Sequence, residues 1–488
     1  MVKLVHGGDI YSARERIEGE IIDFSANLNP LGLPDSVRSA LCDAMDTFCC
    51  YPDPLCRELV EEIAKNEQVD KKNILCGNGA ADLIFRVVWA IRPKNALVAV
   101  PTFAEYQLAL NACGCHVEQF KMKEEQDFVL TEEFLSCIRP ETDLVFLCNP
   151  NNPTGQLIDR KLLERILVRC AACGTMLVVD ECFRDFLDNP EENSMKLWVD
   201  SFPNLMILRA FTKHYAMAGL RLGYCLCANP PLLERMNQCG QPWSVSVPAQ
   251  VAGVAALKDT EYLQKSLALI REERTYLKEE LQKLDIRVIG SHANYLFFRL
   301  PDSKDLKDVL EQDGILIRSC ANYPGLNEDY YRIAVKKHEH NQKLIEALER
   351  YLKSPVIEPL AAETVTVRVD DESSGEKQPE TKSCEQNPEQ NPTQTEEDRN
   401  DHLKENHEPE AKTFEEISAE VSEKALEEPQ QAETPEPDVC ETEPTNAQEE
   451  EAPVPKISNA APPSAEQKKQ YRFLRKSKRK YDWEGEDK

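Results

Sequence analysis

Short runs of apolar residues recur along the chain up to about residue 353, and most of them are separated by amphipathic stretches of helix length. Near-continuous apolar runs between helices are typical of strands in a mainly parallel sheet that helices cover on both faces. The pattern therefore predicts an α/β fold with a large domain built on such a sheet. We expect its strands at residues 96–100, 144–148, 176–179, 205–208 and 223–227.

A second, smaller α/β domain is predicted after the large one. Residues 261–283 form a long charged amphipathic stretch with helical spacing, which leads into further alternating strands and helices. We expect these strands at 295–300, 315–318 and 331–335, and the helices at 304–312 and 339–352. The predicted division is an N-terminal arm at 1–54, a large domain at 55–260, a small domain at 261–353 and a tail at 354–488. The arm either packs with the small domain or reaches a partner subunit.

The composition changes at residue 354, after which Glu, Pro, Gln, Thr and Asn dominate. Such a segment buries too little apolar area to offset an ordering cost of roughly 1–2 kcal/mol per residue, so we expect a disordered tail. Much of the net charge of -28 lies there, which argues against a nucleic-acid partner. The tail ends in a basic and aromatic segment, 471–483, which is either a solvated terminus or a docking site for an unknown protein.

The cellular context follows from the cysteines and from the start of the chain. The 18 cysteines are scattered, and the first residues do not resemble a secretory signal, so we expect reduced thiols in the cytoplasm. No apolar run approaches the roughly 20 residues that a membrane crossing needs. Cys170 and Cys173 form a Cys-x-x-Cys pair in a predicted helix without a second pair, so we expect no metal site.

Polar residues with distinct chemistry follow the predicted strands, where open α/β sheets bind ligands. Lys213 and Arg221 suit a Schiff base to an aldehyde cofactor and neutralisation of its phosphate. Asp180 suits the ring nitrogen of a pyridine cofactor, although an Asp here would also cap the next helix. Asn152 is placed to donate to a ring oxygen, and the turn-rich loop around it is a rigid mount for such a donor.

A glycine-rich segment, 76–82, precedes a helix-like run and predicts a phosphate site at a helix N-terminus. The backbone amides of Ala80 and Ala81 would meet the phosphate, and Thr212 would add a hydroxyl. Phe103 would stack on the cofactor ring, or else belong to the core.

Together with four longer stretches, these motifs resemble the fold-type I pyridoxal-phosphate enzymes, in the branch that holds histidinol-phosphate aminotransferase. Within that branch the likeness is greatest to the threonine-phosphate decarboxylases of cobalamin biosynthesis, and it covers about residues 5–353. The four stretches are His6-Gly-Gly8, Asp23-Phe-Ser-Ala-Asn-Leu-Asn-Pro-Leu-Gly32, Pro242-Trp-Ser-Val245 and Ile315-Leu-Ile-Arg-Ser-Cys-Ala-Asn-Tyr-Pro-Gly-Leu326.

The resemblance implies pyridoxal 5'-phosphate as cofactor and gives each matching residue a role. Lys213 would be the Schiff-base lysine, Asp180 the partner of the pyridine nitrogen and Asn152 the ring-oxygen donor. Arg221 and Thr212 would hold the phosphate, and Tyr51 would reach the cofactor phosphate of the other subunit in a homodimer. Residues that match positions near the substrate's phosphate and carboxylate are His6, Asn27, Arg318 and Arg332, whose alternative is surface or interface polarity.

Two departures from the aminotransferase pattern bear on the reaction. Phe183 stands where aminotransferases carry a tyrosine that donates to the ring oxygen, and Ala210 replaces a serine of the phosphate cup. The resembling decarboxylases also carry Phe at this place, so Phe183 and the segment around Arg318 favour decarboxylation of a phosphorylated amino acid, L-threonine O-3-phosphate, to (R)-1-aminopropan-2-yl phosphate. The alternatives are a histidinol-phosphate-type aminotransferase and a decarboxylase of O-phosphoserine. A mainly non-enzymatic adaptor role conflicts with the complete set of cofactor residues.

Overall fold

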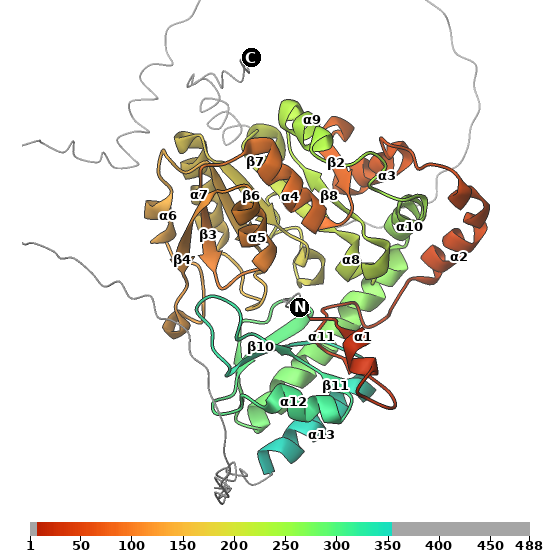
Figure 1. Ribbon diagram of the computed structural model, residues 1–488, viewed down its shortest axis with the longest axis vertical. Coiled ribbons are helices and arrows are strands. Elements are labelled where there is room, and N and C mark those ends of the chain that lie inside the picture. The colour runs from red at the N-terminus through yellow and green to blue at the C-terminus, as the bar shows by residue number, and fades with distance from the viewer. Residues whose placement is uncertain (1–6, 354–488) are drawn as a thin grey trace, which may run out of the picture. The chain divides into compact units, whose positions relative to one another are not determined.

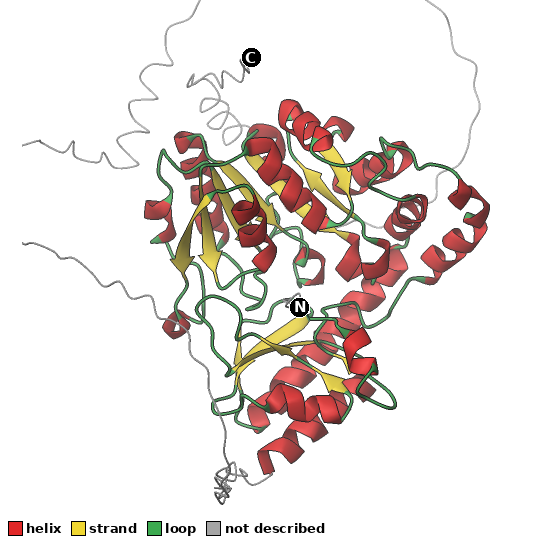
Figure 2. Ribbon diagram, viewed as in Figure 1, coloured by secondary structure: helices red, strands yellow, loops and turns green. Residues whose placement is uncertain are grey.

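A seven-stranded mixed sheet organises the first part of the computed structural model, which describes residues 7–353 (Figures 1 and 2). Its strand order is β2-β8-β7-β6-β5-β3-β4. The neighbours from β7 to β4 are parallel, whereas β8 is antiparallel to both β7 and β2. The strands are β2 (Ile74–Gly77), β3 (Asn95–Val100), β4 (His116–Lys121), β5 (Leu144–Cys148), β6 (Met176–Asp180), β7 (Leu205–Ala210) and β8 (Gly223–Leu226).

Helices cover both faces of this sheet, because successive side chains of its central strands point to opposite faces and both sets are apolar. In β5, for example, Val145 and Leu147 belong to one buried cluster, while Leu144 and Phe146 belong to the other. The first face is covered by α3 (Arg57–Glu67), α7 (Arg160–Cys173) and α10 (Val247–Lys258), and the second by α4 (Ala80–Ile91), α5 (Ala104–Ala112) and α9 (Pro230–Gln238).

A second, antiparallel sheet has the strand order β12-β13-β10-β9 and its own buried cluster. Its strands are β9 (Arg287–Ile289), β10 (Tyr295–Arg299), β12 (Arg318–Ser319) and β13 (Tyr330–Ala334), and its helices are α11 (Thr260–Lys283), α12 (Leu306–Gln312) and α13 (His338–Lys353). The N-terminal strand β1 (Ile22–Asp23) pairs in parallel with β11 (Ile315–Leu316) beside it. α11 joins the two sheets, since its Tyr262 packs in the large-sheet cluster and its Leu277 in the small-sheet cluster.

The remaining helices are short or lie outside the two sheets: α1 (Ile10–Arg14), α2 (Asp35–Asp43), α6 (Phe134–Cys137) and α8 (Phe211–His214). None of the helices in the described part of the chain combines the length and apolar character that a bilayer crossing requires. The predicted tail, with its disorder and its docking segment, lies outside the described residues.

The α/β fold and each strand predicted in the large domain are confirmed, but β2 and β4 of the large sheet, and β1 and β9 elsewhere, were missed. β4 lies at the edge of the sheet and carries polar residues, none of which is fully buried. It therefore lacks the continuous apolar run on which the prediction relied. β2 has only four residues. The strand predicted at 315–318 is divided between β11 and β12, which belong to different sheets.

Candidate active site

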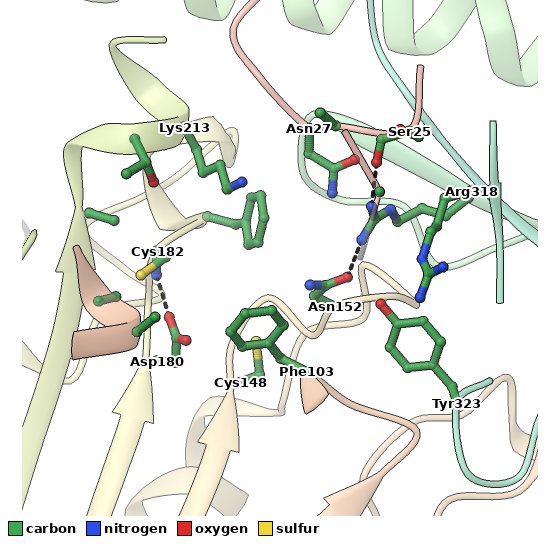
Figure 3. Close-up of a pocket in the computed structure, with 18 of the residues that line it drawn as sticks. Ser25, Asn27, Phe103, Cys148, Asn152, Asp180, Cys182, Lys213, Arg318 and Tyr323 are labelled. Carbon is green, nitrogen blue, oxygen red and sulfur yellow. Dashed lines mark hydrogen bonds between the residues drawn. The ribbon is translucent and has the colours of Figure 1, made fainter. Parts of the chain in front are cut away.

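A cavity of about 210 Å³ opens at the carboxyl ends of β5, β6 and β7, where the polar residues predicted from sequence converge (Figure 3). Tyr51 does not line this cavity, and His6 lies outside the described residues. The predicted site residues that line it are Asn27, Ala80, Ala81, Phe103, Asn152, Asp180, Thr212, Lys213, Arg221, Arg318 and Arg332.

Lys213 follows β7 in the single turn of α8, which the N-terminal arm holds in place. The backbone N–H of Asn29 donates to the carbonyl of Lys213 at 3.1 Å, and the side-chain amide of Asn29 donates to the carbonyl of His214 at 2.7 Å. Burial lowers the pKa of the Lys213 amine to about 8, and the positive charges of Arg332 and Arg221 act in the same direction. A larger share of this amine is therefore neutral and nucleophilic at neutral pH than in a solvated lysine.

Asp180 ends β6 with its carboxylate held from two sides. The hydroxyl of Tyr106 donates to one oxygen at 2.7 Å, and the backbone N–H of Cys182 donates to the other at 3.0 Å. Burial raises the pKa of Tyr106 well above its ordinary value, and the charge of Asp180 adds to this effect, so the hydroxyl remains a donor. A fixed, buried carboxylate at this position suits a ring nitrogen that must stay protonated.

Another part of the cavity wall suits an anion. Gly79 precedes α4 with φ at +83°, and a Cβ built there would lie 2.9 Å from Nη2 of Arg221. Glycine therefore permits the guanidinium to approach the N-terminus of α4, where backbone N–H groups and the helix dipole also favour negative charge. Within the described residues no carboxylate forms an ion pair with Arg221. Thr212, which also lines the cavity, adds a hydroxyl.

Asn152 is oriented by the guanidinium of Arg332. Nη1 of Arg332 donates to Oδ1 of Asn152, and Nη2 donates to the carbonyl of Ser25 at 2.7 Å. Because Oδ1 accepts from Arg332, the amide nitrogen of Asn152 remains as the donor for a ligand. Asn151 keeps the loop rigid by donating to the carbonyl of Pro101 at 3.0 Å and accepting from Thr102 at 2.8 Å.

Two cationic side chains reach the cavity from neighbouring strands of the small sheet. Arg318 of β12 and Arg332 of β13 are directly paired positions in the antiparallel register. Arg318 donates to the side-chain oxygen of Asn322 at 2.7 Å and lies over the ring of Tyr323 at 5.4 Å. Figure 3 shows Arg318 on the side of the cavity away from Asp180 and Lys213.

Polar atoms without partners also fit a ligand rich in oxygen and nitrogen atoms. Oδ1 of Asn27 and Nε of Arg332 are buried and make no hydrogen bond within residues 7–353. Buried polar groups in proteins are nearly always satisfied, so these atoms point to a ligand or water in the cavity. A nucleophilic amine, a buried carboxylate, an anion cradle and an amide donor together match what a phosphorylated pyridine aldehyde requires.

Sequence reasoning missed several residues of this site. Ser25, Cys182 and Tyr323 line the cavity, and Tyr106 holds Asp180 from outside it. Tyr106 lies one helical turn after Phe103, which was the only signal in its favour. The other three fall inside or beside motifs in which roles were predicted for neighbouring residues only.

The chain belongs to the aminotransferase class I and II family, whose profile matches residues 19–348. Members of this family are enzymes that depend on pyridoxal 5'-phosphate, and this chain is a pyridoxal-phosphate enzyme with the fold-type I architecture predicted from its motifs.

Individual relatives define the likeness further. The threonine-phosphate decarboxylase of Salmonella typhimurium is 39% identical over 352 residues, which are 71% of this chain and 96% of that protein. The crystal structure of L-threonine-O-3-phosphate decarboxylase from Porphyromonas gingivalis has a TM-score of 0.61 at 27% identity, over 68% of this chain and 99% of that one. The histidinol-phosphate aminotransferase of Clostridium acetobutylicum has a TM-score of 0.64 at 30% identity, over 67% of this chain and 98% of that one.

Proposed function

We propose that the chain decarboxylates L-threonine O-3-phosphate and releases (R)-1-aminopropan-2-yl phosphate for cobalamin biosynthesis. The observation that carries this proposal is the register of β12 and β13, which sets Arg318 beside Arg332 at the cavity. Two guanidinium groups suit a substrate with two anionic groups, a phosphate and a carboxylate. The relation to the Salmonella enzyme supports the same substrate class.

The cofactor roles follow the geometry of the cavity. With pyridoxal phosphate bound, Lys213 would hold it covalently, Asp180 would pair with its ring nitrogen, and Asn152 would donate to its ring oxygen. Arg221, Thr212 and the N–H groups of α4 would hold its phosphate, and Phe103 would pack on its ring. Phe183 lines the cavity where aminotransferases carry a tyrosine, which leaves Asn152 as the donor to the ring oxygen.

The proposed domains divide this work. The large domain, 55–260, supplies the cofactor residues, and the small domain, 261–353, supplies the two arginines. The arm, 1–54, contributes Asn27 and His6 to the substrate site and Tyr51 to a partner subunit. Tyr51 is 80% exposed and lies away from its own cavity, which supports a homodimer in which it serves the other copy.

Pyridoxal phosphate, when bound, supplies a protonated ring that accepts the electron pair of the bond that breaks. Arg318 and Arg332 fix the substrate's phosphate and carboxylate and thereby select the bond from the α-carbon to the carboxylate. That bond breaks, carbon dioxide leaves, and the protonated form of the Lys213 amine would deliver its proton to the α-carbon and become neutral.

The test is to incubate the purified chain with L-threonine O-3-phosphate and to measure carbon dioxide and the amine product. Release of both in equal amounts is the expected result. O-phosphoserine, which lacks one methyl group, serves as the comparison substrate, since a methyl group changes specificity by on the order of 1 kcal/mol. A higher kcat/KM for O-phosphoserine would make O-phosphoserine the preferred substrate, and the proposed reaction would still be a decarboxylation.

The second candidate is amino transfer from histidinol phosphate, because a histidinol-phosphate aminotransferase is also among the similar structures. It predicts a carbonyl product, no carbon dioxide and conversion of the cofactor to its amine form. If the chain gives only this outcome with L-threonine O-3-phosphate and with O-phosphoserine, it is not a decarboxylase.

A further inference from the structure

Trp243 belongs to a sequence motif, Pro242-Trp-Ser-Val245, to which neither the fold nor the proposed chemistry gives a role. Its indole ring stacks on the ring of Tyr51, with a centroid distance of 4.7 Å and an interplanar angle of 31°. Trp243 is 48% exposed and Tyr51 is 80% exposed. Two exposed aromatic side chains in contact form an apolar patch of the kind that marks an interaction surface.

The backbone at Trp243 is constrained as well. Its φ is +57°, a left-handed conformation that is costly for a residue with a side chain. Such a conformation persists only where the surroundings fix it. Here it directs the indole toward Tyr51.

The two loops that carry this aromatic pair are tied together through one side chain. The amide nitrogen of Gln250, on α10, donates to the carbonyl of Asp53 at 3.0 Å and to the carbonyl of Val245 at 3.0 Å. The segment after Tyr51 and the segment after Trp243 are therefore fixed to the same helix. The ring contact with Trp243 and these hydrogen bonds hold Tyr51 at the surface, where it remains 80% exposed.

We propose that Trp243 is a positioning residue for the neighbouring subunit: it holds Tyr51 in the orientation in which its hydroxyl meets the cofactor phosphate of a second copy of this chain. The inference rests on the proposed function, in which Tyr51 acts across a homodimer. It adds that the indole of one copy determines how tightly the other copy retains its cofactor.

The first measurement is the rate constant of cofactor release, followed by the visible absorbance of holoenzyme moved into cofactor-free buffer. Trp243→Gly removes the indole and tolerates the positive φ, so folding is not strained. We expect release to become about 10-fold faster, the factor for loss of one charge-assisted hydrogen bond. Trp243→Phe keeps an aromatic ring and should stay within about 2-fold of the unaltered chain.

A hybrid dimer then tests whether the effect crosses between subunits. One chain carries Lys213→Ala with Trp243 intact, the other carries Trp243→Gly with Lys213 intact, and two different affinity tags isolate the mixed dimer. The only lysine-linked cofactor lies in the second chain, and an intact Tyr51–Trp243 pair of the first chain serves it. We expect its release rate to return to that of the unaltered enzyme. Release as fast as in the Trp243→Gly homodimer would overturn the inference, because Trp243 would then act within its own chain.

A second hybrid, in which Tyr51→Phe replaces Trp243→Gly in the chain that keeps Lys213, tests the role of Tyr51 separately from that of Trp243. If cofactor retention is restored in the Tyr51→Phe hybrid but not in the Trp243→Gly hybrid, Tyr51 acts across the dimer and the role of Trp243 alone is rejected. A chain that sediments as a monomer would reject this inference and the proposed homodimer, whereas a chain that takes up no cofactor would reject the proposed decarboxylation as well.

Discussion

Lys213 combines the depressed pKa and the position that the proposed chemistry requires, and this makes its titration testable. A protonated amine does not attack an aldehyde, so below a pKa of about 8 only the neutral fraction reacts. In the apoenzyme, the rate of cofactor incorporation should rise with pH up to about 8 and then level off. A rate that still rises toward the ordinary lysine pKa would contradict the burial of this amine.

Removal of the positive charge of Arg332 should shift the same pH dependence. Arg332→Gln takes away the neighbouring positive charge that lowers the pKa of Lys213, so the plateau should move to higher pH. Arg299→Gln is the control, because Arg299 also belongs to the small sheet but pairs with Glu124 at 3.0 Å away from the cavity. It should leave the profile unchanged.

Tyr106 should matter through its hydroxyl alone. Tyr106→Phe keeps the ring stacked on Phe146 at 4.9 Å and removes the donor to Asp180. We expect kcat to fall on the order of 10-fold with little change in KM, since a hydrogen bond to a charged group contributes about 1.5–3 kcal/mol. Tyr262→Phe, which removes a hydroxyl bound to the carbonyl of Gly32, is the matched control and should keep kcat within about 2-fold. Equal losses in the two variants would assign the effect to general destabilisation.

Local sequence patterns identified three of these site residues but missed Tyr106. Lys213, Asp180 and Asn152 were predicted because each stands in a local motif after an apolar run. Tyr106 acts on a residue 74 positions away, and no local pattern records that contact. Its partner is set by the parallel pairing of strands, which brings α5 beside the end of β6.

At the scale of elements, burial decided what the sequence could predict. β5 and β6 are buried along their whole length and were predicted within one residue, whereas the partly exposed edge strand β4 was missed. The register of β12 against β13 was also beyond prediction, because pairing depends on contacts between distant segments. That register places Arg318 beside Arg332, so the substrate wall depends on an arrangement that the strand pattern alone does not specify.

A buried ion pair should hold the ends of two catalytic strands together. Glu181 follows β6, Arg209 lies near the end of β7, and their side chains pair at 2.9 Å with at most 2% exposure. Burial raises the pKa of Glu181, and Arg209 counteracts that rise. Glu181→Gln leaves Arg209 without its nearest counter-charge and should cost about 3 kcal/mol of unfolding free energy, measured by urea denaturation.

The control for this prediction is an exposed pair of the same chemistry. Glu261→Gln breaks the pair with Lys265, in which the two side chains are 76% and 66% exposed, and should cost less than about 1 kcal/mol. The double variant Glu181→Leu with Arg209→Met should be more stable than Glu181→Gln, because the uncompensated guanidinium is gone while Glu67 keeps Lys196 at 3.4 Å and Asp185 keeps Arg184. A single variant as stable as the control would mean that Glu67 and Asp185, which also approach Arg209, already compensate its charge.

For the molecule as a whole, the described residues contain the two larger sheets with their buried clusters and the cavity, and the last helix closes the small cluster. α13 buries Leu344, Ile345 and Leu348 against it. A chain that ends at Lys353 keeps these contacts, so we expect the kcat, cofactor content and melting temperature of the full chain.

A chain that ends at Lys337 loses all three side chains, each worth about 1.5–3 kcal/mol of burial. Their sum approaches the total stability of a typical domain. This shorter chain should lose cofactor and unfold at a markedly lower temperature. Loss of turnover already in the chain that ends at Lys353 would show that the acidic tail takes part in the reaction, and the boundary predicted at residue 353 would then be wrong.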